Sequence, residues 1–261
     1  MDVVILCGGK GARMREETEY RPKPMVEVGG RPLLWHIMRL FAHHGMDRFI
    51  LCLGYKGSVI RDYFLDFEAR SRDCTVRYDD AGGRRVECHG APEHPPFSVT
   101  LVDTGQETLT GGRVKRIEPH ITTGDTFVVT YGDGLADVDL RRLVDFHRAH
   151  GRVATVTAVQ PWSRFGLLSI DGDSRVTRFA EKARVEGWIN AGFFVFDRRI
   201  FDYLRGGDGE ALEAVPLERL AADGELMAYR HEGSFLAVDT YRDYLQVNDL
   251  WQRGAAPWKV W

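Results

Sequence analysis

The sequence is poor in cysteine, has no long apolar run and carries little net charge, and each shortage excludes a class of protein. The four cysteines include no Cys-x-x-Cys pair, which argues against a disulfide framework. No stretch approaches the ~20 apolar residues of a membrane span, and the start of the sequence lacks the basic and apolar parts of a secretory signal. A net charge of -3 gives no general affinity for nucleic acid or an anionic membrane. We therefore expect a cytoplasmic protein with no nucleic-acid or membrane partner, in which any anion site depends on particular residues.

The N-terminal part alternates between strand-like and helix-like segments. The apolar run from Val3 to Cys7 ends at two glycines, a pattern typical of a strand buried on both faces. A helix opens at Pro32 and stops at Gly45, so the run from Phe49 to Leu53 can return as a parallel neighbour. With 261 residues, 44% of them hydrophobic, the sequence predicts a single domain over residues 1–261 with a doubly wound, mostly parallel α/β sheet.

The rest of the chain continues this alternation with shorter segments. Further strands are predicted at 98–102, 126–131 and 153–159, and further helices at 58–67, 139–150, 211–222 and 242–253. After Pro161 the predicted strands shorten to 167–170, 176–180 and 193–196. We expect these later segments to extend the same sheet and to build the far wall of a cleft.

A polar stretch from 68 to 97 interrupts the alternation. Within it, strand-like segments at 75–78 and 84–88 flank Ala81-Gly82-Gly83, which is a hairpin signal. We read residues 68–97 as a hairpin insertion within the domain. His89 and His94 lie in this stretch but lack the spacing of a closed metal site, so we expect them at the surface.

A glycine-rich loop, CGGKGARM at residues 7–14, follows the first predicted strand. Backbone without side chains lets N–H groups approach phosphate oxygens, and Arg13 can add a forked positive charge. The loop is not a kinase-type P-loop, because no Gly-Lys-Ser/Thr ending follows, and Met14 occupies the third glycine position of the dinucleotide-binding motif. Taken alone, the motif favours an ordinary tight turn that needs positive φ.

Three further charged residues stand at restricted positions. Lys23 lies between two prolines, which limit where its ammonium group can go, although a solvated lysine is the plainer interpretation. Asp133 sits in a Gly-Asp-Gly turn after an apolar strand, where open α/β sheets bind ligands, and its carboxylate is a hard oxygen ligand for Mg²⁺. Asp239 follows the apolar run 235–238, where it could also cap the next helix, just as Asp133 could satisfy a turn. The two aspartates together favour a metal site.

These motifs occur in an order that resembles the sugar-1-phosphate nucleotidyltransferase family, and within it the glucose-1-phosphate cytidylyltransferases. The resemblance runs nearly end to end and also includes LVDTG (101–105), TGGR (110–113), YGDG (131–134), RFG (164–166), EK (181–182), INAGFF (189–194), VDT (238–240) and APWK (256–259). It implies a Rossmann-like, GT-A-like nucleotidyltransferase fold and Mg²⁺-dependent transfer of a nucleotidyl group from an NTP, with CTP favoured, to a sugar 1-phosphate. The products would be pyrophosphate and a nucleotide sugar such as CDP-glucose. The resemblance also implies a homo-oligomer in which the hairpin insertion makes subunit contacts.

The resemblance gives roles to the residues at matching positions. Arg13 would face the leaving pyrophosphate, Lys23 the α-phosphate and Lys182 the sugar phosphate, while Asp133 and Asp239 would hold Mg²⁺. The residues expected to bind the nucleotide are Cys7, Gly8, Gly9, Gly11, Ala12, Arg13, Thr110, Gly111, Gly112, Arg113 and Asp133, with 110–113 against the nucleobase. The residues expected to bind the sugar are Phe165, Gly166, Glu181, Lys182, Asn190 and Gly192.

Four departures from the family pattern leave other functions open. They are Ala12 for a threonine, Ala183 for a proline, Ala191 for a glycine, and Leu236 with Ala237 in a wall that is usually aromatic and proline-rich. Because these changes alter the sugar pocket, the sugar or nucleotide could differ from glucose 1-phosphate and CTP, or the fold could serve a metal-dependent isomerase or mutase of a finished nucleotide sugar. A non-catalytic nucleotide-sugar sensor is disfavoured, because it would not need the full set of cationic side chains. That set favours nucleotidyl transfer.

Overall fold

The computed structural model of the chain describes residues 1–11, 14–92, 94–163 and 165–261. A seven-stranded sheet forms its centre, in the order β14 (Leu226–Arg230), β10 (Ala154–Val159), β13 (Ile189–Asp197), β8 (Thr126–Tyr131), β1 (Asp2–Leu6), β4 (Arg48–Leu53) and β7 (Ser98–Asp103). Within the described ranges, β13 is antiparallel to both of its neighbours and the other pairs of this sheet are parallel. The predicted α/β class and mostly parallel sheet are therefore confirmed.

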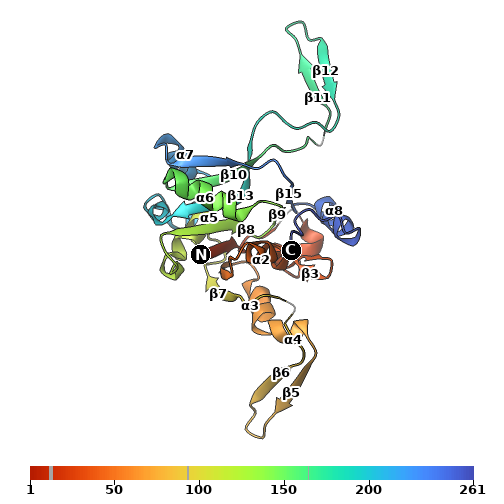
Figure 1. Cartoon of the computed structure of the whole chain (residues 1–261), viewed down its shortest axis with the longest axis vertical. Helices are drawn as coiled ribbons and strands as arrows, with labels where there is room; N and C mark the ends of the chain where they lie inside the picture. The colour runs from red at the N-terminus through yellow and green to blue at the C-terminus, as the bar shows by residue number, and fades with distance from the viewer. Residues whose placement is uncertain (12–13, 93, 164) are drawn as a thin grey trace.

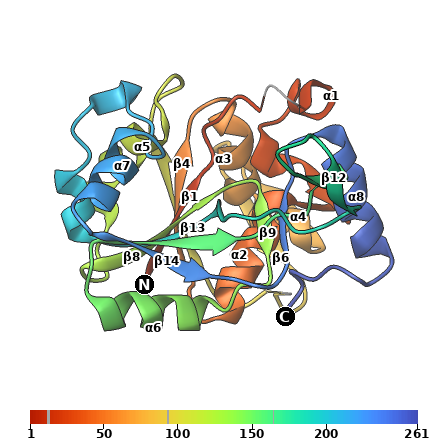
Figure 2. The same cartoon turned by 90° about the horizontal axis from the view of Figure 1, so that it is seen from above.

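Helices cover both faces of the sheet because β1 is apolar on both sides. Val3 and Ile5 point into a core shared with α2 (Leu33–His43), α6 (Leu140–His150) and α8 (Tyr241–Gln252). Val4 and Leu6 point into a second core, shared with α5 (Thr110–Arg116) and α7 (Val215–Ala222). Figure 2 shows α5 and α7 on one side of the sheet and α6 on the other. The continuous apolar pattern of the first strand thus predicts its two-sided burial correctly.

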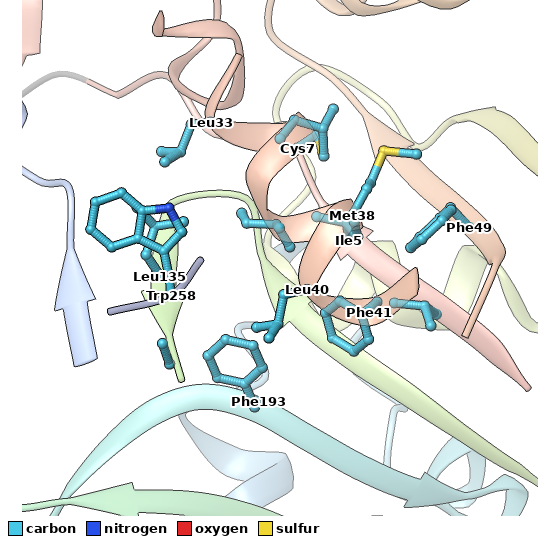
Figure 3. Packing of buried hydrophobic residues seen from close by; sticks show 14 of the residues in the cluster. Ile5, Cys7, Leu33, Met38, Leu40, Phe41, Phe49, Leu135, Phe193 and Trp258 are labelled. Carbon is cyan, nitrogen blue, oxygen red and sulfur yellow. The ribbon is translucent and has the colours of Figure 1, made fainter. Parts of the chain in front are cut away.

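The first core also holds the C-terminal segment in place. Phe41 of α2 packs against Phe193 of β13 with ring centroids 6.1 Å apart, and Trp258 is fully buried near them (Figure 3). The indole N–H of Trp258 donates to Nδ1 of His36 at 3.4 Å, and the other ring nitrogen of His36 lies 2.8 Å from the carbonyl oxygen of Val28. The last residues are therefore part of the fold and not a loose tail.

Two hairpins leave the body of the molecule in opposite directions (Figure 1). We call them the first arm, β5 (Cys74–Tyr78) with β6 (Arg84–Cys88), and the second arm, β11 (Leu167–Ile170) with β12 (Val176–Ala180). The first arm is the predicted hairpin, and α3 (Gly57–Leu65) and α4 (Phe67–Ser71) lead into it. The expectation that 167–170 and 176–180 extend the central sheet is wrong, because these strands pair with each other in a separate two-stranded sheet.

Small elements complete the fold and shape the loops around the sheet. Two further pairs of strands are antiparallel, β2 (Glu27–Val28) with β3 (Arg31–Pro32) and β9 (Gly134–Ala136) with β15 (Phe235–Ala237). The remaining turns are α1 (Arg15–Thr18), η2 (Lys23–Met25), η3 (Glu118–His120), η4 (Arg198–Asp202) and η5 (Gly207–Gly209). In the part of the chain described, we find no helix with the length and apolarity needed to cross a bilayer.

Candidate active site

A cavity of about 470 Å³ opens where β1 and β8 end. Its walls come from the glycine-rich loop after β1, the turn that carries Lys23, the approach to α5 and the turn after β8. The lining residues are Leu6, Cys7, Gly8, Gly9, Lys10, Gly11, Lys23, Pro24, Thr108, Leu109, Thr110, Arg113, Tyr131, Gly132, Asp133 and Asp239. The carboxyl edge of a parallel sheet is where open α/β folds bind ligands, so this cavity is the candidate active site.

The pairing of β9 with β15 brings the two predicted metal ligands together. Asp133 directly precedes β9, and Asp239 follows β15 by two positions. In the antiparallel register Ala237 lies opposite Gly134, and the amide of Val238 donates to the carbonyl oxygen of Asp133 at 2.9 Å. Two aspartates far apart in the sequence are thereby fixed side by side at one edge of the cavity.

Lys23 lies between these two carboxylates. Its ammonium nitrogen is 2.7 Å from Oδ2 of Asp133 and 2.5 Å from Oδ1 of Asp239. The turn that carries it is rigid, because Pro22 precedes the short helix η2 and Pro24 follows within it. Pro24 packs on Gly132, where an added Cβ would lie only 2.7 Å from the proline Cγ. The Lys-Pro turn is thus seated directly on the strand end that presents Asp133.

This carboxylate pair fits a divalent cation, because both side chains already converge on one positive group. Magnesium is commonly held by one or two carboxylates, with substrate phosphates and water completing its shell. Within the described residues, no cluster of three or more His, Cys, Asp or Glu side chains offers a cage made of protein alone. The site can therefore supply Asp133 and Asp239 to a metal that arrives with a phosphate substrate.

Arg113 is buried beneath the glycine-rich loop. Its guanidinium group donates to the carbonyl oxygens of Leu53, Gly105 and Gly8, at 3.0, 2.8 and 3.1 Å, and to the hydroxyl of Thr104 at 2.7 Å. An added Cβ at Gly8 would lie 2.1 Å from this group, so the first glycine is needed for close packing. Burial lowers the pKa of Arg113 from its ordinary value. Arg113 therefore joins the loops after three strands, a role that its sequence context did not reveal.

The predicted nucleotide residues divide into those at the cavity and those behind it. Cys7, Gly8, Gly9, Gly11, Thr110, Arg113 and Asp133 line the cavity, whereas Ala12 and Arg13 lie outside the described residues. The amides of Gly111 and Gly112 donate to the carbonyl oxygen of Glu210, and a Cβ at Gly112 would lie 2.7 Å from the carbonyl oxygen of Gly207. These two glycines thus let α5 pack closely on the segment after η5, and they do not line the cavity.

The predicted sugar residues fall into two groups. Asn190 and Gly192 are in β13 beside the cavity, where the amide of Asn190 donates to the hydroxyl of Tyr131 at 3.4 Å. Phe165, Gly166, Glu181 and Lys182 flank the second arm and do not line the cavity, and Phe165 is 79% exposed. The structure therefore places Asn190 in contact with Tyr131 at the cavity, whereas the other four residues lie beside the second arm.

Sequence reasoning missed Glu213, which connects two walls of the cavity. Its carboxylate accepts a hydrogen bond from the hydroxyl of Tyr131 and another, at 2.6 Å, from the hydroxyl of Thr110. Burial, followed by the negative charge of Glu213, raises the pKa of Tyr131 well above its ordinary value. Tyr131 could have been suspected because it directly precedes the Gly-Asp-Gly turn, but no local signal marks Glu213.

The chain is similar in sequence and in fold to known nucleotidyltransferases. The family described as nucleotidyl transferase matches residues 2–253. The chain is 45% identical over 262 residues to glucose-1-phosphate cytidylyltransferase of Salmonella typhi, covering 100% of both proteins. It is 32% identical to mannose-1-phosphate guanylyltransferase of Mycobacterium tuberculosis, covering 98% of this chain and 66% of the relative. The crystal structure of HddC from Yersinia pseudotuberculosis has the same fold, with a TM-score of 0.69 at 24% identity over 96% of this chain and 99% of that one.

Proposed function

Because the chain belongs to the nucleotidyl transferase family, we propose that it transfers a nucleotidyl group from an NTP to a sugar 1-phosphate, with CTP and glucose 1-phosphate as the preferred pair. The observation that carries this proposal is the convergence of Lys23, Asp133 and Asp239 at the mouth of the glycine-rich loop. The full-length similarity to a glucose-1-phosphate cytidylyltransferase supports the choice of substrates.

The proposed reaction is an in-line displacement at the α-phosphorus. An oxygen of the sugar phosphate forms a new P–O bond, the bond to the β-phosphate breaks, and pyrophosphate leaves. Both substrates are anionic, so the protein must supply orientation and positive charge and needs no covalent nucleophile. The glycine-rich loop and Lys23 line the same cavity, and we propose that amides of the loop meet phosphate oxygens and that Lys23 meets the α-phosphate.

Family members generally use a divalent metal, and here we propose Mg²⁺ held by Asp133 and Asp239. When bound, it would neutralise charge on the phosphate oxygens. Arg13 is proposed to face the leaving pyrophosphate, and Lys182 the sugar phosphate. The segment from Thr108 to Thr110 is proposed to lie against the nucleobase, because it lines the cavity at the start of α5.

We also propose a cytoplasmic homo-oligomer in which neighbouring copies contact the arms. The second arm exposes four large apolar side chains, Leu168, Ile170, Val176 and Phe179, with exposed fractions of 53%, 60%, 50% and 65%. An apolar surface of this kind is typical of a protein contact. Light scattering of the purified chain tests this proposal, and a monomer at all concentrations would contradict it.

Pyrophosphate release is the decisive assay for the proposed reaction. The protein is incubated with Mg²⁺, each NTP in turn and a panel of sugar 1-phosphates, with Asp133→Asn as the inactive control. We expect the fastest release with CTP and glucose 1-phosphate, and almost none with the variant. Absence of release with every pair, together with tight binding of a nucleotide sugar, would instead support the isomerase or mutase considered from the sequence.

The predicted sugar-phosphate role of Lys182 has its own test. Lys182→Ala should raise the KM for the sugar 1-phosphate by roughly tenfold or more, because one ionic contact to a phosphate is lost. The Kd for the NTP should change far less. Equal losses for both substrates would remove Lys182 from the sugar-phosphate site.

A further inference from the structure

We propose that Lys23 acts as the internal counter-ion of the Asp133–Asp239 pair and gives up that position to a divalent cation when the metal-bound nucleotide enters. This role rests on the proposed function, in which the two aspartates hold the metal and Lys23 meets the α-phosphate. It makes Lys23 a positioning residue before it becomes a catalytic one.

The geometry shows one cation shared by two anions. One oxygen of Asp133 and one oxygen of Asp239 are within hydrogen-bonding distance of the ammonium nitrogen of Lys23, at 2.7 and 2.5 Å. The Lys23 side chain is only 11% exposed, whereas the Asp133 and Asp239 side chains, which line the cavity, are 32% and 33% exposed. Solvent and ligands therefore reach the carboxylates more easily than they reach the lysine stem.

Charge balance explains why this arrangement matters. Two adjacent carboxylates repel each other, and an ammonium between them offsets that repulsion and keeps the pair in place. A divalent cation must occupy much of the same space, since Mg²⁺ binds oxygens at about 2.0–2.1 Å. The metal and the ammonium cannot both lie between these oxygens, so metal binding to the nucleotide-free protein is a competition with Lys23.

A triphosphate resolves this competition. With a metal on the carboxylates, the ammonium group of Lys23, which lines the same cavity as the glycine-rich loop, would pair with phosphate oxygens of the nucleotide. The metal and Lys23 then have separate anionic partners, and neither charge is left unpaired. Metal binding to the pair should therefore be weak without nucleotide and strong with it.

The test measures Mn²⁺ binding to the full chain without nucleotide. Electron paramagnetic resonance detects the Mn²⁺ that remains free in solution. Lys23→Met keeps the length and apolar stem of the side chain but removes its charge. We expect this variant to bind Mn²⁺ about tenfold or more tightly than the unchanged protein, since the competing cation is gone. Lys23→Arg, which keeps a positive charge, is the matched control and should bind Mn²⁺ weakly. Melting curves establish that each variant is folded.

Each outcome decides a different point. Equal or weaker Mn²⁺ binding by Lys23→Met, while Asp133→Asn and Asp239→Asn do weaken binding, would overturn the counter-ion role and leave the metal site standing. Mn²⁺ binding to Lys23→Met that survives both aspartate substitutions would overturn the metal site as well. Pyrophosphate release by the unchanged protein tests the proposed function separately, because it does not depend on the metal affinity of the nucleotide-free state.

The base of the first arm carries an independent feature, two thiols that face each other across β5 and β6. Cys74 and Cys88 are opposite each other in the register, and both are half-buried thiols. The amide of His89 donates to the carbonyl oxygen of Asp73, and the amide of Asp79 donates to the carbonyl oxygen of Gly83. The residue pairs 73/89 and 79/83 are therefore hydrogen-bonded positions of the ladder. Antiparallel ladders alternate, which makes the cysteine pair a position without mutual hydrogen bonds.

We infer that Cys74 and Cys88 are a redox modification site that forms a cross-strand disulfide. At such positions the Cα atoms are about 4.5 Å apart, at the short end of the roughly 4.4–6.8 Å that a disulfide spans. A low-molecular-weight disulfide is the oxidant: one thiolate attacks it and releases one small thiol, then the second cysteine attacks the mixed disulfide and releases the other. The two protein thiols are oxidised, and one small disulfide is reduced to two thiols. Thiol–disulfide exchange with an excess of small thiol opens the same disulfide again.

The other two cysteines provide an internal control. Cys7 and Cys52 are fully buried and belong to cores on opposite faces of the sheet, so they cannot pair with each other. After incubation with oxidised glutathione and alkylation under denaturing conditions, peptide mass spectrometry should show Cys74 linked to Cys88 and the other two alkylated. Dithiothreitol should reverse the link. Cys88→Ser should instead leave glutathione attached at Cys74. Separate glutathione adducts on both cysteines of the unchanged protein, or links between chains, would overturn the site.

Discussion

Arg113 donates a hydrogen bond of 3.1 Å to the carbonyl oxygen of Gly8, and so supports the glycine-rich loop from below. The same guanidinium group reaches the strand end at Leu53 and the turn at Gly105. The glycine-rich loop is therefore held by a buried cation that forms its hydrogen bonds with the protein itself. Several consequences of this arrangement and of its neighbours can be measured.

Replacing Arg113 by methionine should destabilise the protein and disorder the loop. The variant leaves several buried carbonyl oxygens without a donor, for which we expect a loss of about 2–4 kcal/mol in the free energy of unfolding. Urea denaturation measures it. Arg113→Lys should recover only part of the loss, because one ammonium cannot reach oxygens on three loops. Full stability in the methionine variant would contradict the supporting role.

The first two glycines of the loop should respond differently to alanine. A Cβ at Gly8 would lie 2.1 Å from the Arg113 guanidinium, whereas one at Gly9 has no neighbour within 4 Å. We expect Gly8→Ala to lower the free energy of unfolding by about 1–3 kcal/mol through overpacking, and Gly9→Ala to change it little. Thermal unfolding of the two variants side by side makes the comparison, and equal effects would argue against the packing seen at Gly8.

Glu213 should act on the cavity through Tyr131 and Thr110. Glu213→Ala removes the acceptor for both hydroxyls, so we expect kcat/KM to fall by roughly tenfold as the two walls lose their connection. Glu213→Gln keeps one acceptor oxygen and should restore part of the activity. Steady-state kinetics with each substrate varied would show this, and a glutamine variant as impaired as the alanine variant would favour a need for the charge.

The free energy of unfolding should depend on pH through the protonation of two buried histidines. Burial is the main cause that lowers the pKa of His36 and of His147 from 6.5 to about 4. Between these values the unfolded chain binds more protons than the folded one, so stability rises with pH over this window and falls as pH drops from 6.5 towards 4. Each histidine contributes a slope of at most about 1.4 kcal/mol per pH unit.

His36 offers a specific check of that slope. Nδ1 of His36 accepts a hydrogen bond from the indole N–H of Trp258, so protonation of Nδ1 would place two N–H donors against each other. Trp258→Phe removes one donor and should raise the pKa of His36, measured by the pH titration of its ring proton signals in NMR spectra. His36→Gln should flatten the fall in stability below pH 6.5. An unchanged slope would mean that other groups dominate it.

The local elements of this fold are largely predictable from the sequence. The bounds of β8, β11 and β12 match the predicted strands, and α6 begins one residue after the predicted start because Asp139 caps it. The predicted helix at 58–67 is instead two helices, and α7 begins at Val215, four residues later than predicted. The periodicity of apolar residues predicts whether a segment forms a helix or a strand, because this pattern depends on residues that are close together in the sequence.

The position of each element depends on partners that are distant in the sequence. Asp171-Gly172 is a turn signal from which the pairing of 167–170 with 176–180 could have been predicted, but nothing local shows that this hairpin stands apart from the central sheet. The strand β14 was not predicted, although it forms one edge of that sheet. The same limit applies to the site. Asp133 and Asp239 can be predicted from their strand ends, but the hydrogen bonds by which Arg113 joins three loops cannot, and Glu213 was missed, because these contacts join segments that only the folded chain brings together.

The pairing of β9 with β15 has a consequence for the order of events during synthesis. A nascent chain that has emerged through residue 134 already contains the glycine-rich loop, Lys23 and Asp133, but it lacks the strand that delivers Asp239. Half of the carboxylate pair therefore arrives with the last helix, and long-range contacts of this kind form late. Competence to hold a metal at this pair would therefore require synthesis past Asp239, after all seven strands of the central sheet have been made.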